Sequence, residues 1–255
     1  MQFIDTHSHL YDEAFAEGMD LAVERAVQEG VTQIILPDID SSSREQMFNL
    51  AHRHPGHLYT CLGLHPTSIG ADWKTEMEKM EDFKDESIVA IGEIGIDCYW
   101  SKEFLEQQKE AFRIQLKMAH ERNLPVIIHS RESTEIILDI LKNCRSLNLR
   151  GVFHAYSGSR ETYREIQRLG DWNIGIGGVL TFKKASIAET VKDIPLERIV
   201  LETDSPYLTP VPFRGKRNES AYIPHIAAKL AEIKGTDILE VAQQTTLNAK
   251  SLFKI

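Results

Sequence analysis

Residues 88–130 read IVAIGEIGIDCYWSKEFLEQQKEAFRIQLKMAHERNLPVIIHS, and their pattern decides the predicted fold. Short runs rich in Val and Ile at 88–95 and 125–130 predict two buried strands. Between them, residues 102–122 show the apolar spacing of an amphipathic helix. Asn123-Leu124-Pro125 follows directly and stops it. The stretch is therefore a strand–helix–strand unit.

The same alternation recurs along the whole chain. We predict eight strands, at 2–7, 32–37, 57–64, 88–95, 125–130, 151–156, 172–178 and 198–204. We predict nine helices between and after them, at 19–29, 43–54, 74–84, 102–122, 132–144, 159–169, 185–192, 222–234 and 237–253. Strand starts recur about every 28 residues, close to the length of a βαβ unit.

Eight such units predict a (β/α)₈ TIM barrel, and we expect one domain spanning 1–255. An open doubly wound sheet is the alternative. That fold usually carries a glycine-rich phosphate loop after its first strand. Here Thr6-His7-Ser8-His9 occupies that position, which favours the barrel.

Composition excludes several classes of protein. The hydrophobic fraction is 42% and the charged fraction 26%, which is typical of a globular chain. The net charge of −9 argues against a protein that coats nucleic acid through a basic face, although a local cationic site could still attract a phosphate. Three widely spaced cysteines predict no disulfide framework and favour a reducing cytoplasm. We expect no signal peptide, no membrane association and no obligate protein partner.

Candidate metal ligands lie where the predicted strands end. His7 and His9 are two residues apart at the end of the first strand, so both imidazoles can face the same point. Such a pair is also common by chance on a surface. Glu93 is the acid within an apolar run, and a buried carboxylate is costly unless it is paired or bound to a cation.

Three further strands end in similar residues. His129 and His154 each finish an apolar strand, and Asp204 follows the last strand, with Glu202 deeper on the same side. A single histidine in such a place is more often a hydrogen-bonded core residue. In a barrel, however, the carboxyl ends of the strands form one ring that carries the chemistry, and this convergence makes a metal site the better interpretation.

Six nitrogen and oxygen donors exceed what one catalytic zinc uses, so the set predicts two divalent cations, with Glu93 as the natural bridge. Zinc, magnesium and manganese all suit these ligands. We expect the other five histidines to be structural or surface residues: His52, His54, His57, His120 and His225.

The sequence resembles the TatD-type deoxyribonucleases, a branch of the amidohydrolase-like metal barrels. The resemblance covers nearly the whole chain, in the family's order. The stretches that carry it are Phe3–Leu10, Gly63-Leu64-His65-Pro66, Gly92–Asp97, Pro125–Arg131, His154–Gly158, Glu202–Leu208 and Arg214–Asn218.

The resemblance implies that His7 and His9 hold one metal with Asp204, that His129 and His154 hold the second, and that Glu93 bridges them. It also implies hydrolysis of DNA phosphodiester bonds, as a 3'-5' exonuclease on single-stranded DNA or DNA ends. The chain departs from the family pattern at Ala155-Tyr156, at Cys98 and at Ser220. These departures bear on substrate preference and touch no candidate ligand.

In this interpretation, a water activated by the two cations attacks phosphorus, and Asp204 acts as general base. Lys183 and Lys184 follow the seventh strand, in a loop where barrels frequently bind phosphate. The candidate substrate contacts are His65, Arg131, Tyr156, Tyr207, Arg214, Lys216 and Arg217. The two tyrosines could stack on a base or simply pack.

Two other functions remain open from the sequence. The same centre could hydrolyse an ester, lactone or amide, including the aminoacyl ester of a tRNA. A non-catalytic metal-binding protein is the more remote alternative, since an open cleft with Asp204 is more than storage requires.

Overall fold

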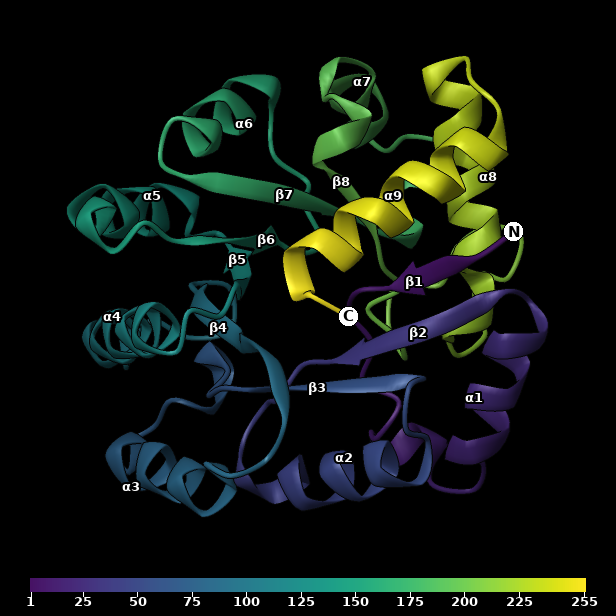
Figure 1. The fold of residues 1–255 in the computed structure, drawn as a ribbon. Coiled ribbons are helices and arrows are strands. Elements are labelled where there is room, and N and C mark those ends of the chain that lie inside the picture. Colours follow the sequence, from purple (N-terminus) through teal and green to yellow (C-terminus); the bar gives the residue numbers. More distant parts are fainter.

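The computed structural model describes residues 1–255, and its centre is one sheet of eight parallel strands in the sequential order β1 to β8 (Figure 1). This order confirms the predicted (β/α)₈ barrel. The strands are β1 (Phe3–Asp5), β2 (Val31–Leu36), β3 (Leu58–Leu62), β4 (Ile88–Asp97), β5 (Val126–Arg131), β6 (Arg150–Phe153), β7 (Asp171–Ile176) and β8 (Ile199–Leu201).

The barrel closes through hydrogen bonds just beyond the ends of β1 and β8. The backbone nitrogen of Thr6 donates to Leu201 O at 2.9 Å, and that of Asp204 donates to His7 O at 2.9 Å. Ser8 and Ser205 form an isolated parallel bridge. The residues that close the barrel are therefore neighbours of three of the candidate ligands.

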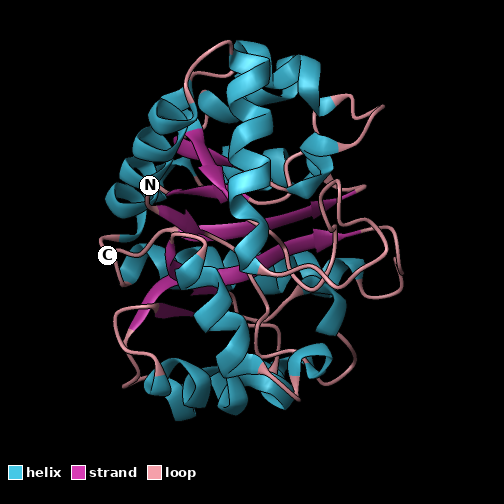
Figure 2. Ribbon diagram, turned by 90° about the vertical axis from the view of Figure 1, so that its right-hand side faces the viewer, coloured by secondary structure: helices cyan, strands magenta, loops and turns pink.

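Helices surround the strands, as Figures 1 and 2 show. They are α1 (Met19–Gln28), α2 (Ser41–Arg53), α3 (Trp73–Glu78), α4 (Leu105–Glu121), α5 (Thr134–Asn143), α6 (Arg160–Gln167), α7 (Ile187–Asp193), α8 (Ile223–Lys234) and α9 (Ile238–Phe253). All nine predicted helices are present. The one predicted at 74–84 is divided, because a 3₁₀ segment, Lys79–Phe83, continues from α3.

The predicted strand at 198–204 also ends early, at Leu201. Asp204 takes a left-handed backbone conformation with φ of 55°, which no strand residue can have. The chain therefore turns at Asp204, the candidate metal ligand. None of the helices has the length and apolar character that a membrane crossing requires.

Helix α9 closes one end of the barrel. Its residues Ala249, Leu252 and Phe253 form one buried apolar cluster with a layer of interior residues from the strands. That layer consists of Ile4, Ile35, Cys61, Ala90, Ile127, Val152 and Val200. Ile127 and Val152 each lie two residues before a candidate histidine, so α9 covers the end opposite to the candidate ligands (Figure 1).

The Phe253→Ala substitution tests the contribution of this closure. Phe253 is 3% exposed, and truncating a buried Phe should lower the free energy of unfolding by about 3–5 kcal/mol. The Leu247→Ala variant is the matched control, because Leu247 lies on the same helix but is 60% exposed, and its effect should stay within about 0.5 kcal/mol. Urea denaturation measures both. Equal effects would show that α9 does not stabilise the barrel through this layer.

Candidate metal centre

The structure brings the six predicted ligands together at one end of the barrel, from just beyond the carboxyl ends of β1, β6 and β8 and from within β4 and β5. His7, His9, Glu93 and His154 are buried, and the side chain of Asp204 is 16% exposed. The backbone beside Glu93 needs glycine, because a Cβ at Gly95 would lie 2.0 Å from His129 O.

The two carboxylate oxygens of Glu93 face two different groups of imidazoles. Oε2 lies 3.0 Å from His7 Nε2 and 3.6 Å from His9 Nε2. Oε1 lies 2.8 Å from His129 Nδ1 and 2.7 Å from His154 Nε2. Glu93 therefore stands between two sets of donors, which is the position of a bridging ligand.

Asp204 belongs to the first of these groups. Its Oδ1 lies 3.6 Å from His7 Nε2 and 3.7 Å from His9 Nε2, and those two nitrogens are 3.2 Å apart. The atoms of His7, His9 and Asp204 are close enough to bind one cation.

Hydrogen bonds outside the centre fix the tautomer of His9 and the orientation of His129. Tyr11 donates its hydroxyl proton to Pro37 O, so it must accept from His9 Nδ1, 3.0 Å away. His9 Nε2 is then left with a free lone pair that faces the centre. His129 Nε2 lies 2.9 Å from Asp97 Oδ2 and its Nδ1 lies 2.8 Å from Glu93 Oε1, and both carboxylates raise its pKa against the effect of burial, so Nδ1 offers a lone pair once a cation displaces its proton. Such outer partners are typical of metal-binding histidines.

The electrostatics differ between the two sides of the centre. Burial lowers the pKa of His154 and of His129, but Glu93 raises that of His154 to about 10 and Asp97 with Glu93 raises that of His129, so a cation on that side must displace protons. Burial lowers the pKa of His9 to about 4, and burial together with His154 lowers that of His7 well below its usual value, so both imidazoles are neutral donors. Burial raises the pKa of Asp204 to about 7. Burial also opposes ionisation of Glu93, but the surrounding histidines hold its pKa well below the usual value.

This donor set fits divalent cations. Neutral imidazole nitrogens suit zinc, and carboxylate oxygens suit magnesium and manganese. A largely enclosed carboxylate such as Asp204, whose ionisation is unfavourable without compensation, gains that compensation from a bound cation.

A cavity of about 650 Å³ opens over the centre. His9, Glu93, His129, His154 and Asp204 are among its lining residues. Its volume lies within the range of small-molecule sites. The centre is therefore accessible from solvent.

Three predicted substrate contacts, His65, Arg131 and Tyr207, line this cavity. His65 Nε2 lies 3.2 Å from Glu93 Oε1, which makes His65 a further possible ligand. However, His65 Nδ1 accepts from the backbone nitrogen of Thr67, so its proton is on Nε2. In this arrangement His65 is a hydrogen-bond donor rather than a metal ligand.

The other four predicted contacts do not line the cavity. Tyr156 is 9% exposed, and its hydroxyl donates to Ser159 O, so these contacts favour packing over base stacking. Arg214 stacks on Phe182, with its guanidinium carbon 4.0 Å from the ring centroid. Lys216 lies over the ring of Phe213, and Arg217 lies over that of Phe15.

The five histidines predicted to be structural make contacts of that kind. His52 and His54 pair with surface carboxylates, His57 and His120 contact backbone carbonyls, and His225 packs edge-on against Phe213.

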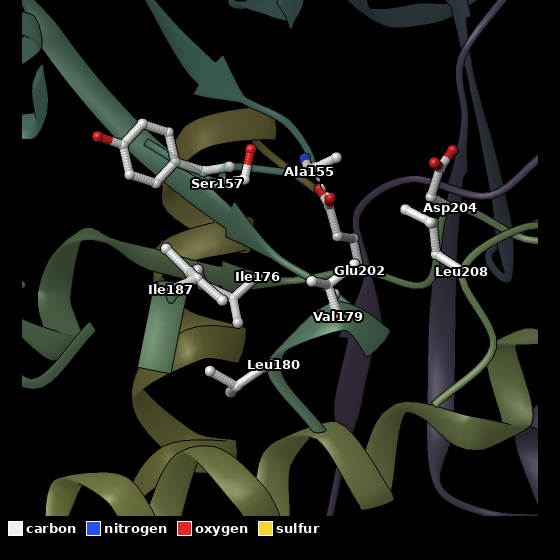
Figure 3. A pocket seen from close by; sticks show the side chains of 11 residues that line it. Ala155, Ser157, Ile176, Val179, Leu180, Ile187, Glu202, Asp204 and Leu208 are labelled. Carbon is white, nitrogen blue, oxygen red and sulfur yellow. Dashed lines mark hydrogen bonds between the residues drawn. The ribbon is translucent and has the colours of Figure 1, made fainter. Parts of the chain in front are cut away.

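Sequence reasoning missed the roles of Tyr11 and Asp97. Asp97 belongs to the same apolar run as Glu93 and follows it by four residues, but the strand period alone does not show that it hydrogen-bonds His129. Glu202, which was expected deeper in the barrel, accepts the backbone N–H of Ala155 with Oε1 at 2.5 Å (Figure 3). Burial raises the pKa of Glu202 to about 8, and its Oε2 has no hydrogen-bond partner.

Comparisons with known proteins agree with this geometry. The family model described as "TatD related DNase" matches residues 4–254. An uncharacterized metal-dependent hydrolase of Bacillus subtilis, YabD, is 38% identical over 98% of both chains. A protein of Erwinia amylovora named as the 3'-5' ssDNA/RNA exonuclease TatD is 34% identical over 98% of both chains.

A solved structure extends the comparison to the fold. The crystal structure of YjjV, a TatD homologue from Escherichia coli, superimposes with a TM-score of 0.89 and 29% identity, over 99% of this chain and 98% of the other. The strand order, the clustered donors and these relatives agree: this protein belongs to the TatD family of metal-dependent hydrolases.

Proposed function

We propose that the protein is a deoxyribonuclease that hydrolyses phosphodiester bonds of single-stranded DNA from a 3' end, with two divalent cations at the centre. The observation that carries this proposal is the position of Glu93, whose two oxygens face two separate sets of imidazoles. The relative named as an exonuclease supports the choice of substrate.

Zinc, magnesium or manganese bound there would activate a water and neutralise the charge that grows on the phosphoryl oxygens. His7, His9 and Asp204 would hold the first cation, and His129 and His154 the second, with Glu93 shared.

Other residues of the chain would orient the substrate. Arg131 is the one Arg or Lys among the residues that line the cavity, and its guanidinium can hold a phosphate oxygen. His65, with its proton on Nε2, can donate to a second oxygen. Asp204 is the partly exposed carboxylate of the centre, so it can take a proton from the attacking water.

Metal removal tests the function directly. EDTA should stop the digestion of an oligonucleotide that carries a label at its 5' end, and added Mg²⁺ or Mn²⁺ should restore it. Products shortened progressively at the 3' end are expected. Aminoacyl and small carboxylic esters should be assayed in parallel with the DNA. Turnover of those esters without any cleavage of DNA would favour the esterase alternative.

The Asp204→Asn substitution tests the general base. Turnover should fall about 10²–10⁴-fold, because the amide cannot accept the proton, while the thermal unfolding midpoint should change little. Asp85→Asn is the matched control, since Asp85 is an exposed aspartate outside the site. Retention of activity by the Asp204 variant would exclude this role.

The affinity for divalent cations should depend on pH through Asp204. Its pKa is raised to about 7, so a proton competes with the cation below that pH and is released above it. Affinity for Mn²⁺ should therefore rise from pH 6 to pH 8. Below pH 7, the logarithm of the Mn²⁺ binding constant should rise with pH more steeply in the wild type than in Asp204→Asn. The difference in slope should correspond to about one proton released on binding, and isothermal titration calorimetry can measure it. Identical slopes would show that Asp204 does not titrate with binding.

A further inference from the structure

Two neighbouring aromatic side chains are exposed beside the cavity. Tyr99 is 50% exposed, and Trp100, at 70%, is the most exposed of the large apolar side chains. Large apolar surfaces exposed beside a cleft mark binding sites more often than an isolated exposed residue does. Trp100 lines the cavity that holds the candidate metal centre.

The turn that carries these rings is fixed relative to the centre. The backbone nitrogens of Tyr99 and Trp100 both donate to Asp97 Oδ1, at 2.9 Å and 3.1 Å. The other oxygen of the same carboxylate accepts from His129 Nε2 at 2.9 Å. One buried carboxylate therefore positions a candidate metal ligand and the aromatic turn together.

Arg131 places a cation against the rings of Tyr99 and Trp100. Its guanidinium carbon lies 3.7 Å from the centroid of the Tyr99 ring and 5.4 Å from that of Trp100. The two rings meet edge to face, with their centroids 5.0 Å apart. Arg131 thus covers Tyr99, and the exposed indole of Trp100 is the surface left for a ligand.

The indole also borders a second cavity, of about 350 Å³. Thr67, Asp97 and Trp100 line both cavities, so the two cavities adjoin at these residues. Its walls include Pro66, Ser101 and Gln108. A planar group that stacks on Trp100 would reach from the metal centre into this side cavity.

We propose that Trp100 is a stacking platform for the base of the nucleotide next to the scissile phosphate, and that the side cavity receives that nucleotide. The proposal rests on the function proposed above. We choose a nucleobase as the ligand for two reasons. The guanidinium of Arg131 beside the rings suits the adjoining phosphate, and every base presents a π-face to an indole. Stacking gives little sequence preference, so the site would accept all four bases.

Steady-state kinetics of Trp100→Ala and Trp100→Phe test this role. The Ala variant should raise KM for a single-stranded oligonucleotide about tenfold with little change in kcat, and Phe should restore most of the loss. The effect on methyl 4-nitrophenyl phosphate, a phosphodiester without a base, should be at least about fivefold smaller. Leu247→Ala, an exposed apolar residue of α9, should leave both activities unchanged.

A second experiment removes the base from the substrate, with an abasic nucleotide next to the scissile bond, in place of removing the indole from the protein. The abasic nucleotide should raise KM for the wild-type protein and have no further effect in Trp100→Ala, because the stacking pair is already broken. Binding gives an independent measurement. Trp73 and Trp172 are 5% and 0% exposed, so quenching of tryptophan fluorescence by a thymidine decamer should report mainly on Trp100. Trp100→Phe should lose that signal.

Each outcome separates the two proposals. Equal losses on the oligonucleotide and the small diester would make Trp100 a structural residue and overturn the stacking site. Normal oligonucleotide kinetics in Trp100→Ala would also overturn it and leave the nuclease function standing. If the wild-type protein cleaves the small diester but no oligonucleotide, the nuclease function fails. The fluorescence titration then decides alone, and absence of quenching by the decamer would overturn the stacking site as well.

Discussion

The buried carboxylate of Glu93 is the constraint on which the rest of the site depends. A negative charge that is 2% exposed in the centre of a barrel is stable only if neighbouring groups compensate for it. Imidazole protons do this: burial lowers the pKa of His154 but Glu93 raises it, to about 10 overall, and His154 and His65 both lie against Oε1. Donor atoms of the surrounding residues are thereby gathered in groups within 4.8 Å, as metal binding requires. The charge that organises the histidines is also the charge that attracts cations.

The outer contacts explain why the imidazoles hold their orientation. Tyr11 fixes the proton of His9 on the side away from Glu93, and Asp97 orients the ring of His129. Thr67 does the reverse for His65 and leaves its proton toward the centre. Histidines that look equivalent by position therefore differ in what faces the centre, because His9 presents a lone pair and His65 a proton.

The sequence predicted the strands, the helices and the convergence of the six candidate ligands, because strand period and βαβ length depend on local residues alone. It could not predict side-chain directions in loops. Tyr156 and Arg214 were predicted substrate contacts because each follows the end of a strand. Tyr156 instead packs into the core, and Arg214 stacks on Phe182. Trp100 was not among the predicted contacts, because an aromatic residue is expected to be buried, and its exposure follows from a turn fixed by Asp97.

Helix α9 and the apolar layer beneath it close the end of the barrel opposite to the candidate ligands. Under the function proposed above, a strand could not thread through the barrel, so the strand would enter and its product would leave through the cavity over the centre. Departure of the product would then have to precede the next advance of the strand.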